Sequence, residues 1–194
     1  VEPGDVVVVK GKTVVPEEKK VYLAFNKPRG IVCTAEKREK NNVIDYLSYP
    51  VRIYPVGRLD KDSEGLLLMT NDGAIVNGIM RARNRHEKEY QVEVNKETTP
   101  EFLKKMASGV PILDTVTRPC RIQKTGERSF TIILTQGLNR QIRRMCEALG
   151  YRVTKLKRVR IMNIHLKDLK TGEYRPLTEK ELAELKKQIG EEKR

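Results

Sequence analysis

The sequence has little of what builds disulfide frameworks, zinc sites or membrane spans. Its 194 residues include three cysteines, none in CxxC spacing, and two histidines. Scattered cysteines in odd number support neither a disulfide framework nor a zinc site. The longest apolar runs, such as residues 6–9 and 66–69, are far too short to cross a bilayer. The first residues also lack the pattern of a signal peptide, so we expect a cytoplasmic protein with no membrane partner.

Positive charge is what the sequence has in excess. Lys and Arg outnumber Asp and Glu 39 to 26, giving a formal charge of +13, and the surplus is spread through the chain. This surplus indicates a polyanionic partner. Attraction to phosphate carries no sequence information, however, so composition alone does not distinguish an RNA enzyme from a ribosomal protein or a DNA binder.

Strand patterns dominate the chain. With 38% hydrophobic residues, its length allows one sizeable core or two small lobes that share an interface. Strands are predicted at residues 21–25, 66–70, 88–94, 129–135 and 153–166. Helices interrupt them irregularly, which does not suit repeated parallel units. We therefore expect an α+β fold built on a mixed, largely antiparallel sheet with flanking helices.

Helix boundaries are marked by capping residues. Thr99 followed by Pro100 suits a helix start, and Gly109 suits its end. Thr178 and Glu181 have the spacing of a capping box for a last helix. Residues 71–73, Asn-Asp-Gly, are interpreted as a turn.

A helix predicted over residues 139–149 has an apolar stripe and three arginines. The stripe repeats at i, i+3, i+4 and i+7, through residues 142, 145, 146 and 149. At about 100° per residue, Arg140 and Arg144 lie opposite the stripe and Arg143 lies on its edge. Arg143 is thus expected to leave the core and enter a cleft.

The most specific signal is the segment GRLDKDSEGLLLMTNDG at residues 57–73. It resembles the catalytic signature of pseudouridine synthases, in which the aspartate after GRL carries out the chemistry. Three further family-like segments occur in the same order, at residues 26–30, 88–90 and 138–145. The resemblance spans roughly residues 21–182 and implies the pseudouridine synthase fold, with a catalytic cleft.

Details of the resemblance indicate a branch of the family. Residues 137–145 are similar to the branch that contains RsuA, RluB, RluE and RluF, and the segments 86–90, 109–113 and 160–163 look most like the RluF type. This implies a monomeric enzyme that modifies an RNA, with a 23S ribosomal RNA stem-loop as the expected substrate and transfer RNA as another. The branch usually carries an S4-type domain in front. Residues 1–16 are therefore interpreted as the C-terminal remnant of an S4-like RNA-binding domain and linker, and residues 17–194 as the catalytic domain.

The chemistry explains the residue types. Breaking the bond between ribose C1′ and uracil N1 develops positive charge on the sugar, which the carboxylate of Asp60 can stabilise or trap. Tyr90 shares an inward strand face with Val92 and Val94, and it supplies an aromatic surface for the base and a hydroxyl for proton transfer. The resemblance implies that Arg143 pairs with Asp60. The reaction has no redox step or group transfer, so no cofactor or metal is expected.

Other basic residues are candidates for substrate contact. Arg58, beside the catalytic loop, is placed to fill the space that a flipped-out base leaves. The remaining candidates are Lys27, Arg140 and Arg144. Taken singly, these residues have simpler interpretations as turn, core or solvated side chains.

Two alternatives stay open for the function. A noncatalytic RNA-binding or ribosome-assembly module would explain the charge and the S4-like segment, but not Asp60, Tyr90 and Arg143 together. A pseudouridine synthase that acts on 16S ribosomal RNA or on transfer RNA would preserve the chemistry and change the substrate.

Overall fold

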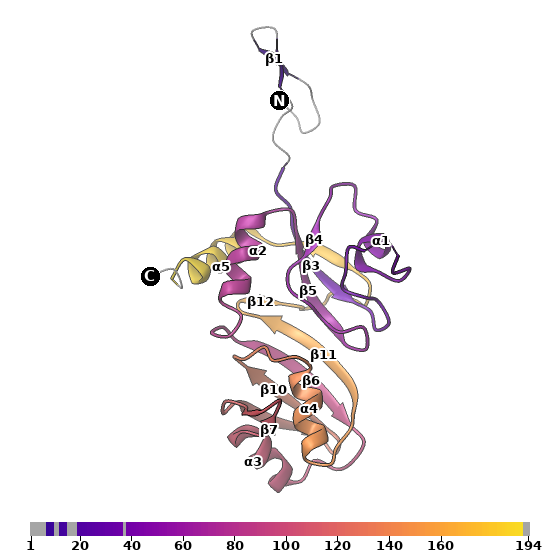
Figure 1. Cartoon of the computed structure of the whole chain (residues 1–194), viewed down its shortest axis with the longest axis vertical. Helices are drawn as coiled ribbons and strands as arrows, with labels where there is room; N and C mark the ends of the chain where they lie inside the picture. The colour runs from indigo at the N-terminus through magenta and orange to yellow at the C-terminus, as the bar shows by residue number, and fades with distance from the viewer. Residues whose placement is uncertain (1–6, 10–11, 15–18, 37, 192–194) are drawn as a thin grey trace.

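The computed structural model describes residues 7–9, 12–14, 19–36 and 38–191 (Figure 1). Strands β1 (Val7–Val9) and β2 (Lys12–Val14) pair antiparallel. The domain boundary expected at residue 16 lies outside the described residues.

Within the described residues, nine strands form one sheet in the order β13-β3-β5-β11-β6-β10-β9, with β12 paired to β11 and β4 paired to β5. The only parallel pair in that sheet joins β5 to β11. The predicted mixed, largely antiparallel sheet is therefore confirmed. Its strands are β3 (Tyr22–Lys27), β4 (Tyr54–Pro55), β5 (Glu64–Thr70), β6 (Lys88–Val94), β9 (Arg121–Gly126), β10 (Ser129–Leu134), β11 (Val153–Ile161), β12 (Ile164–His165) and β13 (Tyr174–Pro176).

The described helices are α1 (Val43–Leu47), α2 (Gly73–Arg81), α3 (Pro100–Ser108), α4 (Gln141–Ala148) and α5 (Glu179–Glu191). A short hairpin, β7 (Pro111–Ile112) and β8 (Thr115–Val116), follows α3. The predicted start of α3 is confirmed, since Thr99 Oγ1 accepts from Phe102 N at 3.1 Å. The capping box of α5 is present too, with Thr178 and Glu181 bonding each other's backbone N–H.

The interpretation of residues 71–73 as a turn is wrong. Asp72 is the N-cap of α2, and its side chain accepts from the backbone N–H groups of Ala74 and Ile75. An aspartate before a helix and an aspartate in a turn satisfy backbone donors in the same way, so the local pattern did not separate the two structures. Gly78 of α2 then lets α5 approach, because a Cβ there would lie 2.3 Å from Ile189.

The core is divided between the two ends of the sheet. One buried cluster lies where α3 and α4 pack on β6, β10 and β11. Two others lie on the opposite faces of β3 and β5, one under α2 and α5 and one beside α1. Figure 1 shows the two ends of the sheet as an upper and a lower lobe, with β11 running between them. The structure thus has the two lobes around a shared interface that the composition allowed.

Gly65 fixes the close approach of the two lobes. It has a φ of +107° and pairs with Arg158 where β5 meets β11. A Cβ at this position would lie 2.2 Å from the carbonyl oxygen of Arg158, so only glycine fits. This contact holds the loop that precedes β5, residues 56–63, against β11 and β6.

Candidate active site

A cleft of about 490 Å³ lies between the two lobes. The loop at residues 56–63 forms one wall, and β6, β11 and the segment that leads into α4 form the others. The polar and aromatic residues that line it include Arg58, Asp60, Ser63, Arg83, His86, Lys88, Tyr90, Asn139, Arg140 and Arg158. Of the residues singled out from the sequence, Arg58, Asp60, Tyr90 and Arg140 therefore share one cleft.

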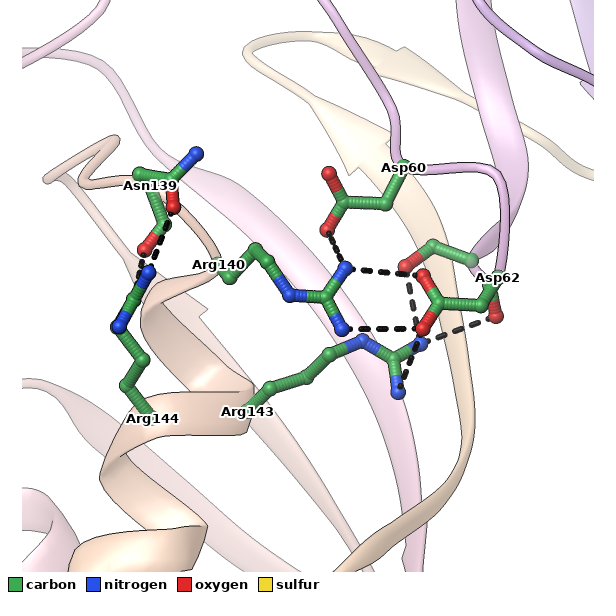
Figure 2. Close-up of polar contacts among 7 residues, drawn as sticks. Asp60, Asp62, Asn139, Arg140, Arg143 and Arg144 are labelled. Carbon is green, nitrogen blue, oxygen red and sulfur yellow. Dashed lines mark hydrogen bonds and ion pairs between the residues drawn. The ribbon is translucent and has the colours of Figure 1, made fainter.

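The carboxylate of Asp60 is held by Arg140. Figure 2 shows the Arg140 guanidinium between two carboxylates: Nη1 donates to Asp60 Oδ2 at 3.2 Å and to Asp62 Oδ1 at 3.1 Å, and Nη2 donates to Asp62 Oδ2 at 3.0 Å. Arg140 occupies the left-handed region, with a φ of +50°, as the N-cap of α4. The hydrogen bonds from Arg140 lower the pKa of Asp62, so this carboxylate stays ionised.

Arg143 lies behind the loop instead of pairing with Asp60. Its Nη2 donates to the carbonyl oxygen of Asp62 at 3.0 Å and to Ser63 Oγ at 3.1 Å, and its Nη1 lies 3.6 Å from Asp62 Oδ2 (Figure 2). Only 7% of the residue is exposed. The predicted Arg143–Asp60 pair is thus wrong: the N-cap position of α4 sets Arg140 opposite Asp60, and the first turn sets Arg143 under the backbone of the loop.

Arg144 contacts the segment that precedes α4. Its Nε donates to the Asn139 carbonyl oxygen at 2.9 Å and its Nη2 donates to Asn139 Oδ1 at 3.0 Å (Figure 2). Asn139 lines the cleft and Arg144 does not. The contact therefore braces the cleft wall, and it does not support the predicted role of Arg144 in substrate binding.

Tyr90 forms an aromatic wall of the cleft. It is half-buried, packs against the lower core and pairs with Ile132 of β10 and Arg158 of β11. The inward direction predicted from strand alternation is confirmed. Arg58 is exposed at the mouth of the cleft, next to Leu59, which is buried.

Lys27 cannot contact a substrate. It has no exposed surface, and its Nζ donates to the carbonyl oxygens of Pro28 at 3.0 Å and Ile31 at 2.8 Å. Burial lowers the pKa of Lys27 to about 8. The structure contradicts the assignment of this lysine to substrate binding, because β3 turns its side chain into the protein, where it holds the turn after the strand.

Three charged residues of the site had no predicted role. Asp62 lies inside the GRLD segment, yet only the structure shows it binding both Arg140 and Arg143. Lys88 precedes Tyr90 by two positions, so the alternation that turned Tyr90 inward also placed Lys88 on that face. Arg158 belongs to a strand of alternating basic and apolar residues, whose inward face the sequence left undetermined.

The described residues form neither a metal site nor a membrane-spanning helix. They contain no group of three or more His, Cys, Asp or Glu side chains arranged to hold a metal ion. No helix among them has the length and apolar character needed to cross a membrane.

Comparison with known proteins gives consistent matches. The family model for RNA pseudouridylate synthase matches residues 21–148. The dual-specificity RNA pseudouridine synthase RluF of Escherichia coli strain K12 is 53% identical over 191 residues, which cover 97% of this chain and 66% of that protein. The ribosomal large subunit pseudouridine synthase B of Bacillus subtilis is 36% identical over 180 residues, covering 89% of this chain and 74% of that protein.

Among solved structures, a crystal structure of a pseudouridylate synthase matches with a TM-score of 0.80 at 28% identity, covering 95% of this chain and 82% of the other. The chain spans just under two thirds of the length of the RluF relatives, 66% in the Escherichia coli protein.

Proposed function

The chain belongs to the RNA pseudouridylate synthase family, and on that premise we propose that it isomerises a specific uridine of 23S ribosomal RNA to pseudouridine. The observation that carries the proposal is the position of Asp60. Its carboxylate lines the same cleft as Tyr90 and is held by a guanidinium of α4. A charged carboxylate facing an aromatic wall is what cleavage of a glycosidic bond and retention of the freed base require.

Asp60 acts on the sugar. Cleavage of the C1′–N1 bond develops positive charge at C1′, which a carboxylate stabilises or traps covalently. The side chain of Asp60 is 35% exposed, so the ribose can reach it. Arg140, which binds both Asp60 and Asp62, holds the carboxylate in position before the substrate arrives.

Tyr90 acts on the base. The freed uracil has to turn and rejoin through C5, and a stacking surface keeps it in the cleft while it does so. The phenol hydroxyl then accepts or relays the proton that leaves C5. The target uridine reaches this cleft only when it is flipped out of the RNA, and Arg58 at the mouth is placed to fill the vacated space.

Arg143 acts through the loop. It donates to the backbone of Asp62 and to Ser63, both within three residues of Asp60. Its buried charge therefore fixes the loop that carries the catalytic carboxylate. Arg143 is a positioning residue in this proposal, and Arg140 is the arginine in contact with Asp60.

The choice of RNA follows the relatives. RluF is described as having dual specificity, and the Bacillus subtilis relative as acting on the large ribosomal subunit. The charge of +13 fits a substrate rich in phosphate. A 23S ribosomal RNA stem-loop is the first candidate, and a transfer RNA anticodon stem-loop is the candidate for a second specificity.

Residues 1–16 are proposed to be the end of an S4-like RNA-binding domain, with residues 17–194 as the catalytic domain. The protein is proposed to act as a monomer in the cytoplasm. A noncatalytic ribosome-assembly module would have the same charge and no use for the Asp60 site.

The test is to map pseudouridines by carbodiimide reactivity in 23S, 16S and transfer RNA that has been incubated with or without the protein. One new carbodiimide-reactive uridine in 23S ribosomal RNA is expected. A new site only in 16S or transfer RNA would support the pseudouridine synthase activity but show that its substrate is a different RNA. Binding of all three RNAs without any new site would favour the assembly module.

A further inference from the structure

Two cations on the same sheet face as Tyr90 have no part in the proposed mechanism so far. Lys88 lies two positions before Tyr90 on β6, and Arg158 is the partner of Tyr90 on β11. Residues two apart on a strand, and residues opposite each other on paired strands, point to the same side of a sheet. Both side chains accordingly line the cleft with Tyr90.

Neither cation is neutralised within the described part of the chain. Arg158 is only 7% exposed, and its Nε donates to the Leu66 carbonyl oxygen at 2.9 Å. No described residue accepts from its two Nη groups or forms a salt bridge with it. Lys88 donates its Nζ to the carbonyl oxygens of Arg83 and of Thr135, the latter at 3.0 Å, which leaves the third N–H.

The pKa of Lys88 likewise reflects the lack of a neighbouring anion among the described residues. Burial and, to a lesser extent, the nearby charges of Arg158, Arg118 and Arg83 together lower the pKa of Lys88 to about 8, and no described carboxylate opposes them. A buried cation without an anion is costly, so such groups are unusual in proteins unless a ligand supplies the missing charge.

The cleft is therefore divided by charge. At the loop, Asp60 and Asp62 neutralise Arg140 and Arg143. On the sheet floor beside Tyr90, Lys88 and Arg158 remain unneutralised. The carboxylates face the position of a sugar, whereas the free cations face the position of a base that stacks on Tyr90.

We infer that Lys88 and Arg158 form an anion site for the departing uracil, which they stabilise as the glycosidic bond breaks. This inference rests on the proposed function. The ligand is a pyrimidine anion, and both residues are catalytic in the sense that they donate to the reacting base.

The electron balance requires such an anion. When the C1′–N1 bond breaks, both bonding electrons go to N1, and the negative charge spreads over N1 and the carbonyl oxygens of the ring. This holds whether Asp60 bonds to C1′ or removes a proton from the sugar. When C5 then bonds to C1′, an electron pair of the ring forms the new bond. In the first case the Asp60–C1′ bond breaks and its electrons return to the carboxylate, and in the second Asp60 gives the proton back to the sugar. The proton on C5 leaves to a base, and N1 takes up a proton. Donors fixed where this charge develops are the strongest means of lowering such a barrier.

An RNA phosphate is a weaker candidate for the same site. A phosphate of a flipped nucleotide stays with the backbone near the mouth of the cleft, where Arg58 is exposed. Arg158 is buried on the floor, on the face that Tyr90 gives to the base.

The experiment compares Lys88→Met, Arg158→Met and the charge-retaining Arg158→Lys in the full chain. Single-turnover cleavage of the C1′–N1 bond is measured with RNA that carries uridine or 5-fluorouridine at the target, alongside RNA binding, because 5-fluorouridine has no C5 proton to lose and only the cleavage step can be compared between the two bases. Fluorine makes the base a better leaving group, so its departure needs less help from the cations. Lys124→Met is the matched control, since Lys124 also donates to a backbone carbonyl, that of Thr98 at 3.0 Å, and does not line the cleft.

Lys88→Met and Arg158→Met should each convert uridine about 100-fold more slowly. The loss should be clearly smaller with 5-fluorouridine, Arg158→Lys should recover part of the rate, and binding should change less than about threefold. Rates equal to wild type would overturn the inference while leaving the proposed function intact. A weaker affinity that accounts for the whole loss, with equal effects on both bases, would identify a phosphate contact instead. A wild-type protein that converts no uridine would refute the proposed function itself.

Discussion

At the scale of single residues, Tyr90 allows the stacking surface to be separated from the hydroxyl. Tyr90→Phe retains the ring that packs against the lower core and removes only the group that transfers a proton. RNA binding should persist within about threefold, while the rate of the chemical step falls by about 10²–10⁴-fold if the hydroxyl handles the C5 proton. Single-turnover kinetics with the chemical step limiting would measure this. An unchanged rate would leave Tyr90 as a stacking residue only.

Residue roles were predictable where one strand or one motif fixed them. Strand alternation placed Tyr90 on the inner face, and the GRLD segment singled out Asp60. The partner of Asp60 was not predictable in this way, because it depends on how the first turn of α4 lies against a loop 80 residues away in the chain. Helix periodicity predicted that Arg143 enters the cleft, and this was wrong: Arg143 is buried behind the loop, and Arg140, which precedes the helix as its N-cap, lines the cleft.

At the scale of elements, the contact between β5 and β11 depends on Gly65. An alanine there would meet the Arg158 backbone at 2.2 Å and would also have to adopt a φ of +107°. We expect Gly65→Ala to lower the free energy of unfolding by about 2–5 kcal/mol and to reduce activity further, since the strand contact sets both walls of the cleft. Urea denaturation would measure the loss.

Gly73→Ala is the matched control for that variant. Gly73 is the first residue of α2, and an added Cβ would meet nothing within 4 Å. Its stability should stay the same or rise by a few tenths to about 1 kcal/mol. A Gly65→Ala protein as stable as Gly73→Ala would contradict the close approach of the two strands.

The ion pair at the start of α5 should make the free energy of unfolding depend on pH. Glu181 accepts from Arg175 at 2.8 and 3.0 Å and from the backbone N–H of Thr178, and the bonds from Arg175 chiefly lower its pKa to about 2. Because the folded pKa is below the ordinary value of 4.5, the unfolded chain binds more protons between these values. The stabilisation is therefore complete above about pH 4.5 and is lost as the pH falls towards 2.

Glu181→Gln should accordingly lower stability by about 1–3 kcal/mol at pH 7, and its difference from wild type should shrink as the pH falls below 4.5. Glu184→Gln, which makes the same change at an exposed position of α5, should have little effect at either pH. A difference for Glu181→Gln that stays constant down to pH 2.5 would show that the ion pair does not act as the structure indicates.

Elements were predictable where a single clear signal marked them: capping residues for α3 and α5, and alternation of side chains for β6. Elements were missed where a helix start and a turn make the same hydrogen bonds. Asp72 caps a helix with the same hydrogen bonds that an aspartate makes in a turn. The short helix α1 is capped by Asn42, whose side chain accepts from Asp45 N, but its five residues are too few to show a period.

At the scale of the whole molecule, the class of fold followed from the order of strands and helices, whereas the order of strands in the sheet did not. The parallel pairing of β5 with β11 joins segments about 90 residues apart, and it depends on the packing of both lobes. The cleft exists only because of that pairing, so its lining could be predicted only for residues already placed by the family resemblance.

The proposed S4-like domain in front of the catalytic domain leads to a prediction about salt. A form with that domain complete should contact more phosphates, bind RNA more tightly than this chain and show a steeper dependence of affinity on salt. The slope should rise by about 0.7–0.9 for each added contact. Binding measured between low and physiological salt for the two forms tests this, and equal slopes would count against an RNA-binding role for the front domain.

The central claim is that Asp60 carries the reaction, and Asp60→Asn tests it most directly. The change retains the size of the side chain and an oxygen for Arg140, and it removes the negative charge opposite the sugar. RNA binding should largely persist, because affinity comes mainly from contacts of basic residues with phosphates and from stacking. Tritium release from C5-labelled uridine in a 23S ribosomal RNA fragment should fall by about two to four orders of magnitude or more. Release at the wild-type rate, with binding intact, would contradict the account.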